Sequence, residues 1–401
     1  MGKLRIAAAA AAVVLLSANA GLAAEKKYGP GASDTEIKIG NIMPYSGQAS
    51  ALSGMGKVED AYFKMLNERG GINGRKINFV SYDDGFNPSK TMEQTRKLIE
   101  SDEVLAIFSP IGTPPNLAIQ KYLNTKGVPH LFIMSGVSKW ADPQNYPWSI
   151  GWYPSYIGEG ELYAKFILKN YPNAKIAVFS LNDDSGKELV GGFKKGLGEK
   201  VGMIVAERTA ENTNPTVDSE IVYLKSSGAD LFMSFVGFRL AVQSVKKVAE
   251  LGWKPVYFQD GAGSQIASAL EYADGVISAG FIKEPNDPAW KDDPGAKEYV
   301  AFMDKYAPSI DRTSSNAIWG YALAQTMVQV LQQCGDELTR ENVMKQTLNL
   351  KNFVSPMFLP GVTLNTSPTN YYPISQQQFM QYDLKDKTWR KMGDIISVSS
   401  P

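Results

Sequence analysis

The sequence predicts an α/β protein made of two lobes, each built around a doubly wound parallel sheet. Short apolar runs typical of buried strands alternate with segments whose apolar residues recur every three or four positions, as on one face of a helix. This alternation breaks near residues 140–160 and then restarts, so it runs along the chain twice. The chain has 401 residues, which is too long for one ordinary core and suits two domains.

The first strand–helix–strand unit spans residues 37–84. Residues 37–43 are an apolar run, and a helical pattern over 55–69 leads to a second apolar strand at 77–82. The loop between the first strand and the helix, residues 46–56, is rich in Gly and Ser. Ligands of open α/β sheets bind at the carboxyl ends of the strands, so this loop indicates a ligand site at that edge.

The same order of elements continues up to the break near residues 140–160, resumes after it and continues to a second break near residues 276–293, after which helices and then short alternating segments follow. Further strands are expected at residues 104–108, 128–134, 175–181, 203–208, 231–236 and 255–258. Further helices are expected to open at residues 87–88 and at Thr339, and to span residues 116–126, 187–200, 217–227, 240–251, 296–306 and 316–334. We therefore expect three crossings between the lobes, with lobe I formed by residues 34–152 and 283–353 and lobe II by residues 153–282 and 354–398.

Composition excludes several classes of protein. Lys+Arg and Asp+Glu both total 41, so no charge excess favours nucleic acid or an anionic membrane. Cys334 is the only cysteine, which precludes an internal disulfide and favours a buried apolar role. After the first two dozen residues, no segment approaches the length of a membrane helix, so we expect no membrane insertion.

The start of the chain has the pattern of an export signal. Two basic residues precede an apolar run at 6–16, and small residues at 18–20 or 23–24 suit a cleavage site. We expect residues 1–24 to be a cleaved signal peptide and the mature protein to be periplasmic. No cysteine lies at the cleavage region, which argues against a lipid anchor.

Motifs for catalysis are missing from the sequence. It contains no HExxH, CxxC or GxSxG pattern. His130 is the only histidine, and it lies inside the apolar strand expected at 128–134, which suits a strand residue better than a general base. Asp183 and Asp184 could suggest a metal pair, but adjacent loop carboxylates are usually solvated or cap helices. We expect no catalytic residue, metal site or cofactor.

Four longer motifs point to a family. They are GGINGRKI (residues 70–77), YDDGFNP (82–88), VLAIFSPIGTPPNLA (104–118) and KIAVFSLNDDSGKELVGGFKKGL (175–197). With them, nearly all of residues 33–396 resembles the type I periplasmic binding proteins, and more narrowly the branched-chain amino-acid (Leu/Ile/Val) binding subunits of ABC importers. The resemblance implies a monomeric clamshell that captures a small solute and delivers it to the importer's permease subunits.

The resemblance also implies a set of ligand-binding residues. The Thr113 hydroxyl, at the start of a helix, would receive the ligand carboxylate, and Asp260 would take an ammonium group. The remaining contacts that it implies are Ser53, Ser135, Gly136, Ser138, Ser185 and Phe238. Two interpretations stay open for the aromatic residues Trp152, Tyr153 and Phe238. They could pack under the hinge, or they could line a pocket for an aromatic solute, and Trp152 is therefore included among the expected ligand contacts.

One departure from the family pattern bears on the solute. Pro114 and Pro115 follow Thr113 and have no N–H, so two amide donors usual at a helix start are lost. The expected solutes are an amino acid, or an aromatic or aliphatic carboxylate or amide. Two alternatives remain: a ligand-sensing regulatory subunit on the same fold, and an exported hydrolase with a nucleophile and a base in the cleft.

Overall fold

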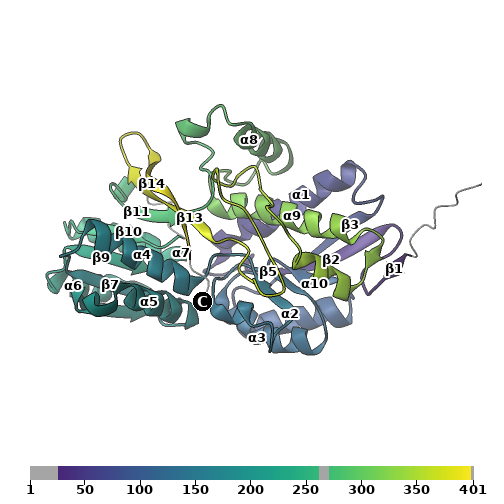
Figure 1. The fold of residues 1–401 in the computed structure, drawn as a ribbon, viewed down its shortest axis with the longest axis horizontal. Coiled ribbons are helices and arrows are strands. Elements are labelled where there is room, and N and C mark those ends of the chain that lie inside the picture. Colours follow the sequence, from purple (N-terminus) through teal and green to yellow (C-terminus); the bar gives the residue numbers. More distant parts are fainter. Residues whose placement is uncertain (1–25, 262–270, 399–401) are drawn as a thin grey trace, which may run out of the picture.

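The computed structural model describes residues 26–261 and 271–398, so the expected signal peptide at 1–24 lies outside the described residues. The chain forms two α/β lobes side by side (Figure 1). The sheet of the first lobe has the strand order β3-β2-β4-β5-β6, and all its strand pairs are parallel. Its strands are β2 (Glu36–Met43), β3 (Lys76–Asp83), β4 (Ala106–Phe108), β5 (His130–Ile133) and β6 (Ser149–Gly151).

Helices cover both faces of the first sheet. On one face, α2 (Pro88–Glu100) and α3 (Thr113–Thr125) pack through Leu98, Ile119 and Leu123. On the other, α1 (Gly54–Glu68) and α9 (Ser315–Cys334) belong to the large core cluster of the lobe. The remaining elements near this lobe are α8 (Pro294–Tyr306), α10 (Arg340–Thr347), β1 (Lys27–Tyr28) and β12 (Glu337–Leu338).

The sheet of the second lobe has the strand order β14-β13-β11-β10-β9-β7-β8. The strands β7 (Ile176–Leu181), β8 (Ile204–Ala210), β9 (Leu231–Phe235), β10 (Val256–Gln259) and β11 (Ile277–Gly280) pair in parallel. An antiparallel hairpin of β13 (Gln376–Asp383) and β14 (Thr388–Ser397) adds the edge, as the turn at residues 385–387 suggests.

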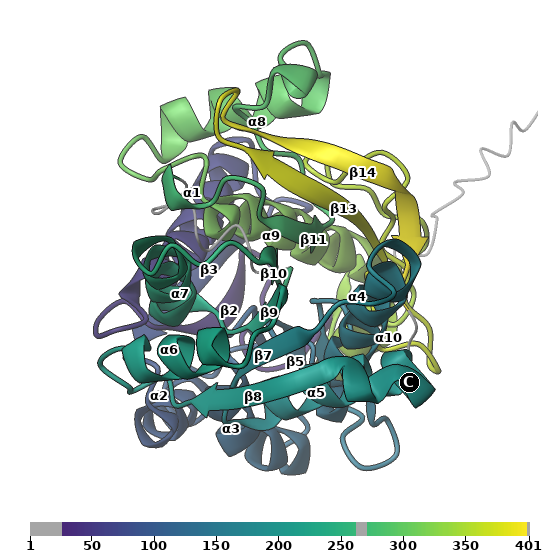
Figure 2. The same ribbon diagram turned by 90° about the vertical axis from the view of Figure 1, so that its left-hand side faces the viewer.

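Two helix pairs enclose the second sheet, as Figure 2 shows. One pair is α6 (Asp218–Ser226) and α7 (Phe238–Glu250), and the other is α4 (Tyr156–Asn170) and α5 (Asp184–Leu197). Strand residues alternate between the two sides: Phe179 joins the cluster with α6 and α7, whereas Val178 joins the cluster with α4 and α5.

The chain crosses between the lobes three times: after β6, after β11, and before β13. This confirms the predicted fold of two parallel-sheet lobes with a three-segment hinge. The limits of the lobes stay a prediction, with one adjustment that we propose. Met357, Leu364 and Ile374 belong to the core cluster of the first lobe, so residues 354–374 are better grouped with that lobe.

One helix of the fold was not predicted. Residues 156–170 form α4, which begins within the stretch near 140–160 where the predicted alternation of strands and helices breaks. Ser155 caps this helix by accepting a hydrogen bond from the Gly158 amide at 3.2 Å. Two glycines let α4 and α5 approach closely, because a Cβ on Gly160 would lie 2.2 Å from the Leu189 carbonyl oxygen and a Cβ on Gly192 2.1 Å from that of Ile157. This packing fixes the position of the cavity residues that α4 carries.

Candidate ligand-binding cavity between the lobes

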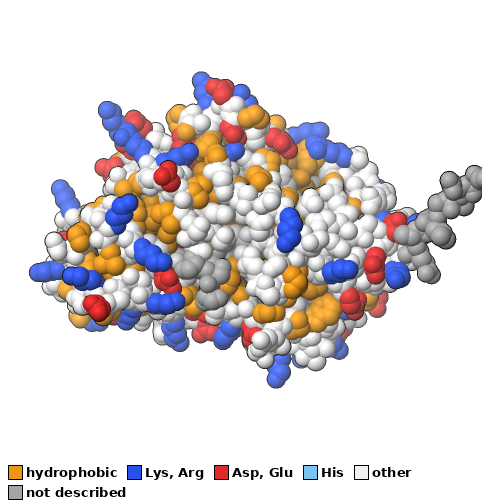
Figure 3. Space-filling view, viewed as in Figure 1, with side chains coloured by type: hydrophobic (Ala, Val, Ile, Leu, Met, Phe, Trp, Pro, Cys, Tyr) orange, Lys and Arg blue, Asp and Glu red, His pale blue; other side chains and the backbone are white. Residues whose placement is uncertain are grey.

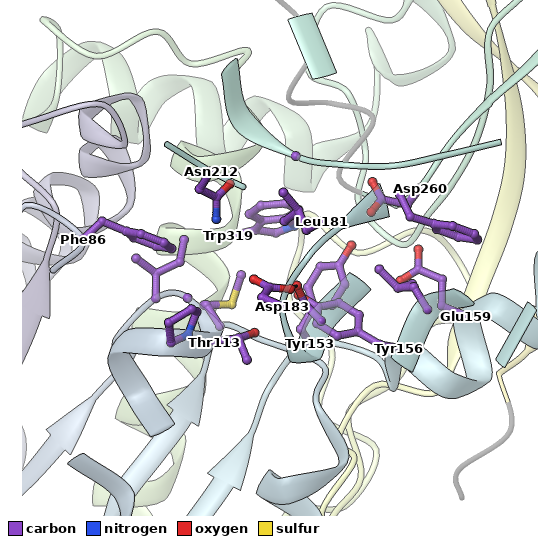
Figure 4. A pocket seen from close by; sticks show the side chains of 18 residues that line it. Phe86, Thr113, Tyr153, Tyr156, Glu159, Leu181, Asp183, Asn212, Asp260 and Trp319 are labelled. Atoms are coloured by element: carbon purple, nitrogen blue, oxygen red, sulfur yellow. Dashed lines mark hydrogen bonds between the residues drawn. The ribbon is translucent and has the colours of Figure 1, made fainter. Parts of the chain in front are cut away.

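A cavity of about 80 Å³ lies between the lobes, at the carboxyl ends of both sheets (Figure 4). Many of its residues come from the segments that follow successive strands. From the first lobe these include Phe86 after β3, Thr113 after β4 and Met134 after β5. From the second lobe they include Asp183 after β7, Asn212 after β8, Gly237 after β9 and Asp260 after β10. A molecule held here touches both lobes at the edge of the sheets where α/β proteins bind ligands.

Thr113 begins α3 and is buried at the cavity wall. Its Oγ1 lies 2.8 Å from the Ser135 hydroxyl, so one of the two donates to the other. Gly112 precedes it with φ of 96° and packs against the Phe86 ring, where a Cβ would come within 2.4 Å. A glycine is required here, and it brings the Phe86 ring next to Thr113.

The start of α3 offers few backbone donors. Pro114 and Pro115 occupy the second and third helical positions and have no N–H. The Asn116 side chain is also engaged: its amide donates to the Gly112 carbonyl at 2.6 Å, and its oxygen lies 2.9 Å from His130 Nε2. Capture of an anion at this helix start therefore has less support than at an ordinary helix N-terminus.

On the opposite wall, Asp183 caps α5. Its carboxylate accepts hydrogen bonds from the Gly186 amide at 3.0 Å and from the Ser185 hydroxyl. Asp183 and Ser185 both line the cavity, but the Ser185 hydroxyl already donates to the Asp183 carboxylate. The N-terminus of α5 partly offsets the charge of Asp183, since a helix N-terminus is the positive end of the helix dipole.

Two further carboxylates lie together at one end of the cavity, where Figure 4 labels Glu159 and Asp260. Glu159, on α4, accepts a hydrogen bond from the Gly261 amide at 2.7 Å, and Asp260 accepts one from the Gln259 side chain at 3.0 Å. Burial of Glu159, and then the nearby charge of Asp260, raise the pKa of Glu159 to about 8.

Aromatic side chains form much of the remaining wall. Tyr153 packs edge-on against Trp319 at 5.8 Å between ring centres and lies 5.9 Å from Tyr156. Burial raises the pKa of both tyrosines, so their hydroxyls stay protonated. Trp319 comes from α9 of the first lobe and is 3% exposed, and its Nε1 has no hydrogen-bond partner among the described residues.

Three of the nine residues predicted to bind the ligand line the cavity: Thr113, Ser185 and Asp260. Ser135 lies directly behind Thr113, to which it is hydrogen-bonded. Gly136 is not among the lining residues; its carbonyl accepts from the Tyr156 amide at 2.9 Å, and a Cβ there would lie 2.1 Å from the Pro154 carbonyl oxygen. It is a close-packing position at the hinge.

Ser53, Ser138 and Trp152 also lie outside the cavity lining. Ser53 is buried where a short 3-10 helix (Ser50–Ser53) joins α1. Ser138 donates its amide and its hydroxyl to the Glu188 carboxylate of α5, at 2.8 and 2.6 Å, and so joins the two lobes. Trp152 is fully buried, donates to Thr326 at 3.4 Å and packs against Phe281, which favours the hinge interpretation over the pocket.

The last predicted residue, Phe238, begins α7, but its side chain lies outside the described part of the structure. Sequence reasoning missed Glu159, Tyr156, Asn212 and Trp319 as cavity residues. For Glu159 the available signal was the cap Ser155, which would have predicted α4 and placed an acidic residue in its first turn. Trp319 lies within a helix that is apolar nearly all round, so nothing in the pattern set it apart.

His130 has no place in the cavity. It is fully buried in β5, and burial lowers its pKa to about 3, so the ring is neutral. In the described residues, no group of three or more His, Cys, Asp or Glu side chains is placed to hold a metal ion. Among the described residues, no helix is long and apolar enough to cross a bilayer.

Comparisons with known proteins identify the family and the fold of the chain. A family model described as periplasmic binding protein matches residues 36–386. No curated protein matches the chain by sequence. The solved structures show the same fold at low identity, among them a branched chain amino acid ABC transporter protein from Thermus thermophilus with bound valine. That similarity has a TM-score of 0.81 and 17% identity over 91% of this chain and 97% of the other.

Two further solved structures are similar in fold. A fatty acid ABC transporter substrate-binding protein from Thermomonospora curvata has a TM-score of 0.79 and 19% identity, covering 93% of this chain and 95% of that one. A solute binding protein of an ABC transporter from Rhodopseudomonas palustris BisB5, in complex with 3,4-dihydroxy benzoic acid, has a TM-score of 0.76 and 20% identity, covering 92% and 99%. The ligands named for these proteins differ widely in chemistry.

Proposed function

The chain belongs to the periplasmic binding protein family, and on that basis we propose that it is the substrate-binding subunit of an ABC importer. It would capture a small organic solute between its lobes and release it unchanged. The family is one of binding proteins, so no bond is broken in this role.

The observation that carries the proposal is a cavity whose walls come from both lobes. Thr113 and Trp319 belong to the first lobe, and Ser185 and Asp260 to the second. A solute that contacts all of them binds the closed arrangement better than an open one. By population shift, it therefore stabilises closure, which a permease can recognise.

We propose roles for the predicted residues that line the cavity. The Thr113 hydroxyl would contact an acceptor or donor of the solute, supported from behind by Ser135. Ser185 would act through its hydrogen bond to Asp183, by holding that carboxylate in place. Asp260 would take the positive end of the solute, because it lies at the acidic end of the cavity with Glu159.

The proposed partners are the small solute and the permease subunits of an importer, with the protein acting as a periplasmic monomer. Three similar structures come from proteins whose names include an ABC transporter, which supports this assignment at the level of the fold. The outer surface carries Lys and Arg interspersed with Asp and Glu on the face shown in Figure 3, as suits a protein that docks by complementary contacts.

Ligand-induced stabilisation and closure test the function. Amino acids, aromatic acids, aliphatic acids, amides and amines should be screened by thermal shift, and each hit should be measured by calorimetry. A true solute raises the melting temperature because it binds only the folded cleft. The same solute should reduce the radius of gyration in X-ray scattering. A panel in which no solute of any class binds, or binding without any change in lobe arrangement, would refute the proposed role.

A further inference from the structure

The charge of the cavity wall is one-sided. Glu159, Asp183 and Asp260 contribute carboxylates, and no Lys, Arg or His is among the described residues that line the cavity. The stretch 262–270, which follows Asp260 in the sequence, contains no charged residue either. A solute with a net negative charge would enter this site without a side-chain cation to pair with it, at a large desolvation cost.

The three carboxylates are not equivalent. Asp183 is engaged at the N-terminus of α5, where the Gly186 amide and the Ser185 hydroxyl donate to it. Glu159 and Asp260 lie together at the other end, where burial and the charge of Asp260 raise the pKa of Glu159 to about 8, so that Glu159 is largely protonated near neutral pH. A positive group placed beside them would favour the ionised form of Glu159, because the carboxylate then gains an attractive charge.

Aromatic rings complete this surface. Five aromatic side chains line the cavity: Phe86, Tyr153, Tyr156, Phe235 and Trp319. The faces of such rings carry partial negative charge and attract ammonium groups, with tryptophan the strongest. Acidic and aromatic groups together therefore favour a cation over an anion of the same size.

The Trp319 indole indicates a second feature of the solute. Its N–H is buried without a partner among the described residues, and the side chain lines the cavity. A buried donor without a partner is unfavourable, so an oxygen acceptor on the solute would satisfy it. The indole is neutral, and so it suits an amide, ester or hydroxyl oxygen without needing a carboxylate.

From these observations, and on the premise of the solute-binding function above, we propose that the cavity selects a small organic cation that carries a neutral oxygen acceptor. Its ammonium group would lie near Glu159 and Asp260, and its oxygen would accept from Trp319. A free carboxylate is disfavoured, because Pro114 and Pro115 remove amide donors where an anion would otherwise bind. The cation is organic, since the described acidic residues do not form a metal-binding group.

Matched ligand sets test this selection directly. Leucinamide, leucine, isocaproate and isocaproamide share one carbon skeleton and differ in the amino group and in the carboxylate or amide, so that they are a cation, a zwitterion, an anion and a neutral amide. Phenylalaninamide, phenylalanine, hydrocinnamate and hydrocinnamide form a second set with an aromatic body. Each compound is added to the full-length mature protein in thermal-shift assays, and the dissociation constants of those that bind are measured by calorimetry.

The expected result is that the cationic amides bind most tightly, by about tenfold or more over the zwitterions, with no binding of the two acids. Asp260→Asn and Glu159→Gln should each reduce that preference. Glu250→Gln removes an exposed carboxylate at the C-terminal end of α7, the end opposite the cavity residue Gly237, and should leave the preference unchanged.

Three results would overturn the proposal: an acid or neutral amide that binds as well as its cationic counterpart, a zwitterion that binds more tightly than the cation, or no binding of any cationic member. Its failure is distinguishable from failure of the transport role. Tight binding of a solute of another charge class would leave solute capture intact and refute only the preference for cations.

Discussion

At the scale of single residues, Trp319 separates a role in binding from a role in stability. Replacing it by phenylalanine keeps an aromatic ring in contact with Tyr153 but removes the buried N–H. Because that N–H has no partner within the described protein, its loss costs no hydrogen bond in the ligand-free protein, and any fall in melting temperature should come only from the smaller buried ring. Affinity for an oxygen-bearing solute should fall by about 0.5 to 1.5 kcal/mol, measured by calorimetry. Unchanged affinity would remove Trp319 from the site.

Glu159 makes the stability of the protein depend on pH. Its pKa is about 8 in the folded protein and near 4.5 when unfolded. Its contribution is therefore greatest below about pH 4.5 and is lost as pH rises toward 8, since the unfolded chain ionises there more easily than the folded one. Glu159→Gln should flatten the fall in melting temperature between these pH values, while its side-chain oxygen can still accept from Gly261. An equally steep profile in the variant would contradict this assignment.

The predicted site residues show what single-sequence reasoning can reach. Thr113 and Asp260 each lie beyond the carboxyl end of a strand, the edge where α/β proteins bind ligands, and it was the family resemblance that singled out both. Ser138 also follows a strand but turns to Glu188 of the other lobe. Trp152 turns into the hinge core. Which way a loop side chain points depends on packing between lobes, and no local pattern contains that information.

At the scale of elements, the strands were predicted closely because buried parallel strands are continuous apolar runs. The helix α4 was missed because its pattern is unusual. Two glycines lie near its start, and Glu159 and Glu161 are buried on it, so its apolar face does not stand out from the sequence. These features reflect the close contact with α5 and the cavity, which are tertiary properties.

Two adjacent glycines of α5 provide a controlled test of that contact. Gly192→Ala places a Cβ 2.1 Å from the Ile157 carbonyl oxygen, and it should destabilise the protein by about 1 to 3 kcal/mol as α4 is displaced. Gly191→Ala meets no atom within 4 Å and should stabilise the same helix by about 0.5 to 1 kcal/mol. Denaturant unfolding measures both. Similar effects for the two variants would mean that α4 and α5 are not tightly packed.

At the scale of the whole molecule, the two lobes are joined by more than the hinge. Across the cleft, Ser138 of the first lobe donates to the Glu188 carboxylate of the second, and Lys139 pairs with Asp184 at 3.0 Å. The first contact is partly buried, and the second is exposed. Exposed pairs contribute little, whereas hydrogen bonds to a sheltered carboxylate contribute more. The Ser138–Glu188 contact should therefore set how far the lobes close without a solute.

Glu188→Ala tests this control of closure. It removes every hydrogen bond between Ser138 and Glu188, and it should disfavour the closed arrangement by about 1 to 3 kcal/mol, or roughly 5- to 150-fold in population. X-ray scattering of the ligand-free protein should then give a larger radius of gyration. Lys139→Ala is the matched control: it removes the exposed pair beside it and should change the radius little. If both variants scatter like the parent, the hinge segments alone hold the lobes together, and closure does not depend on this contact.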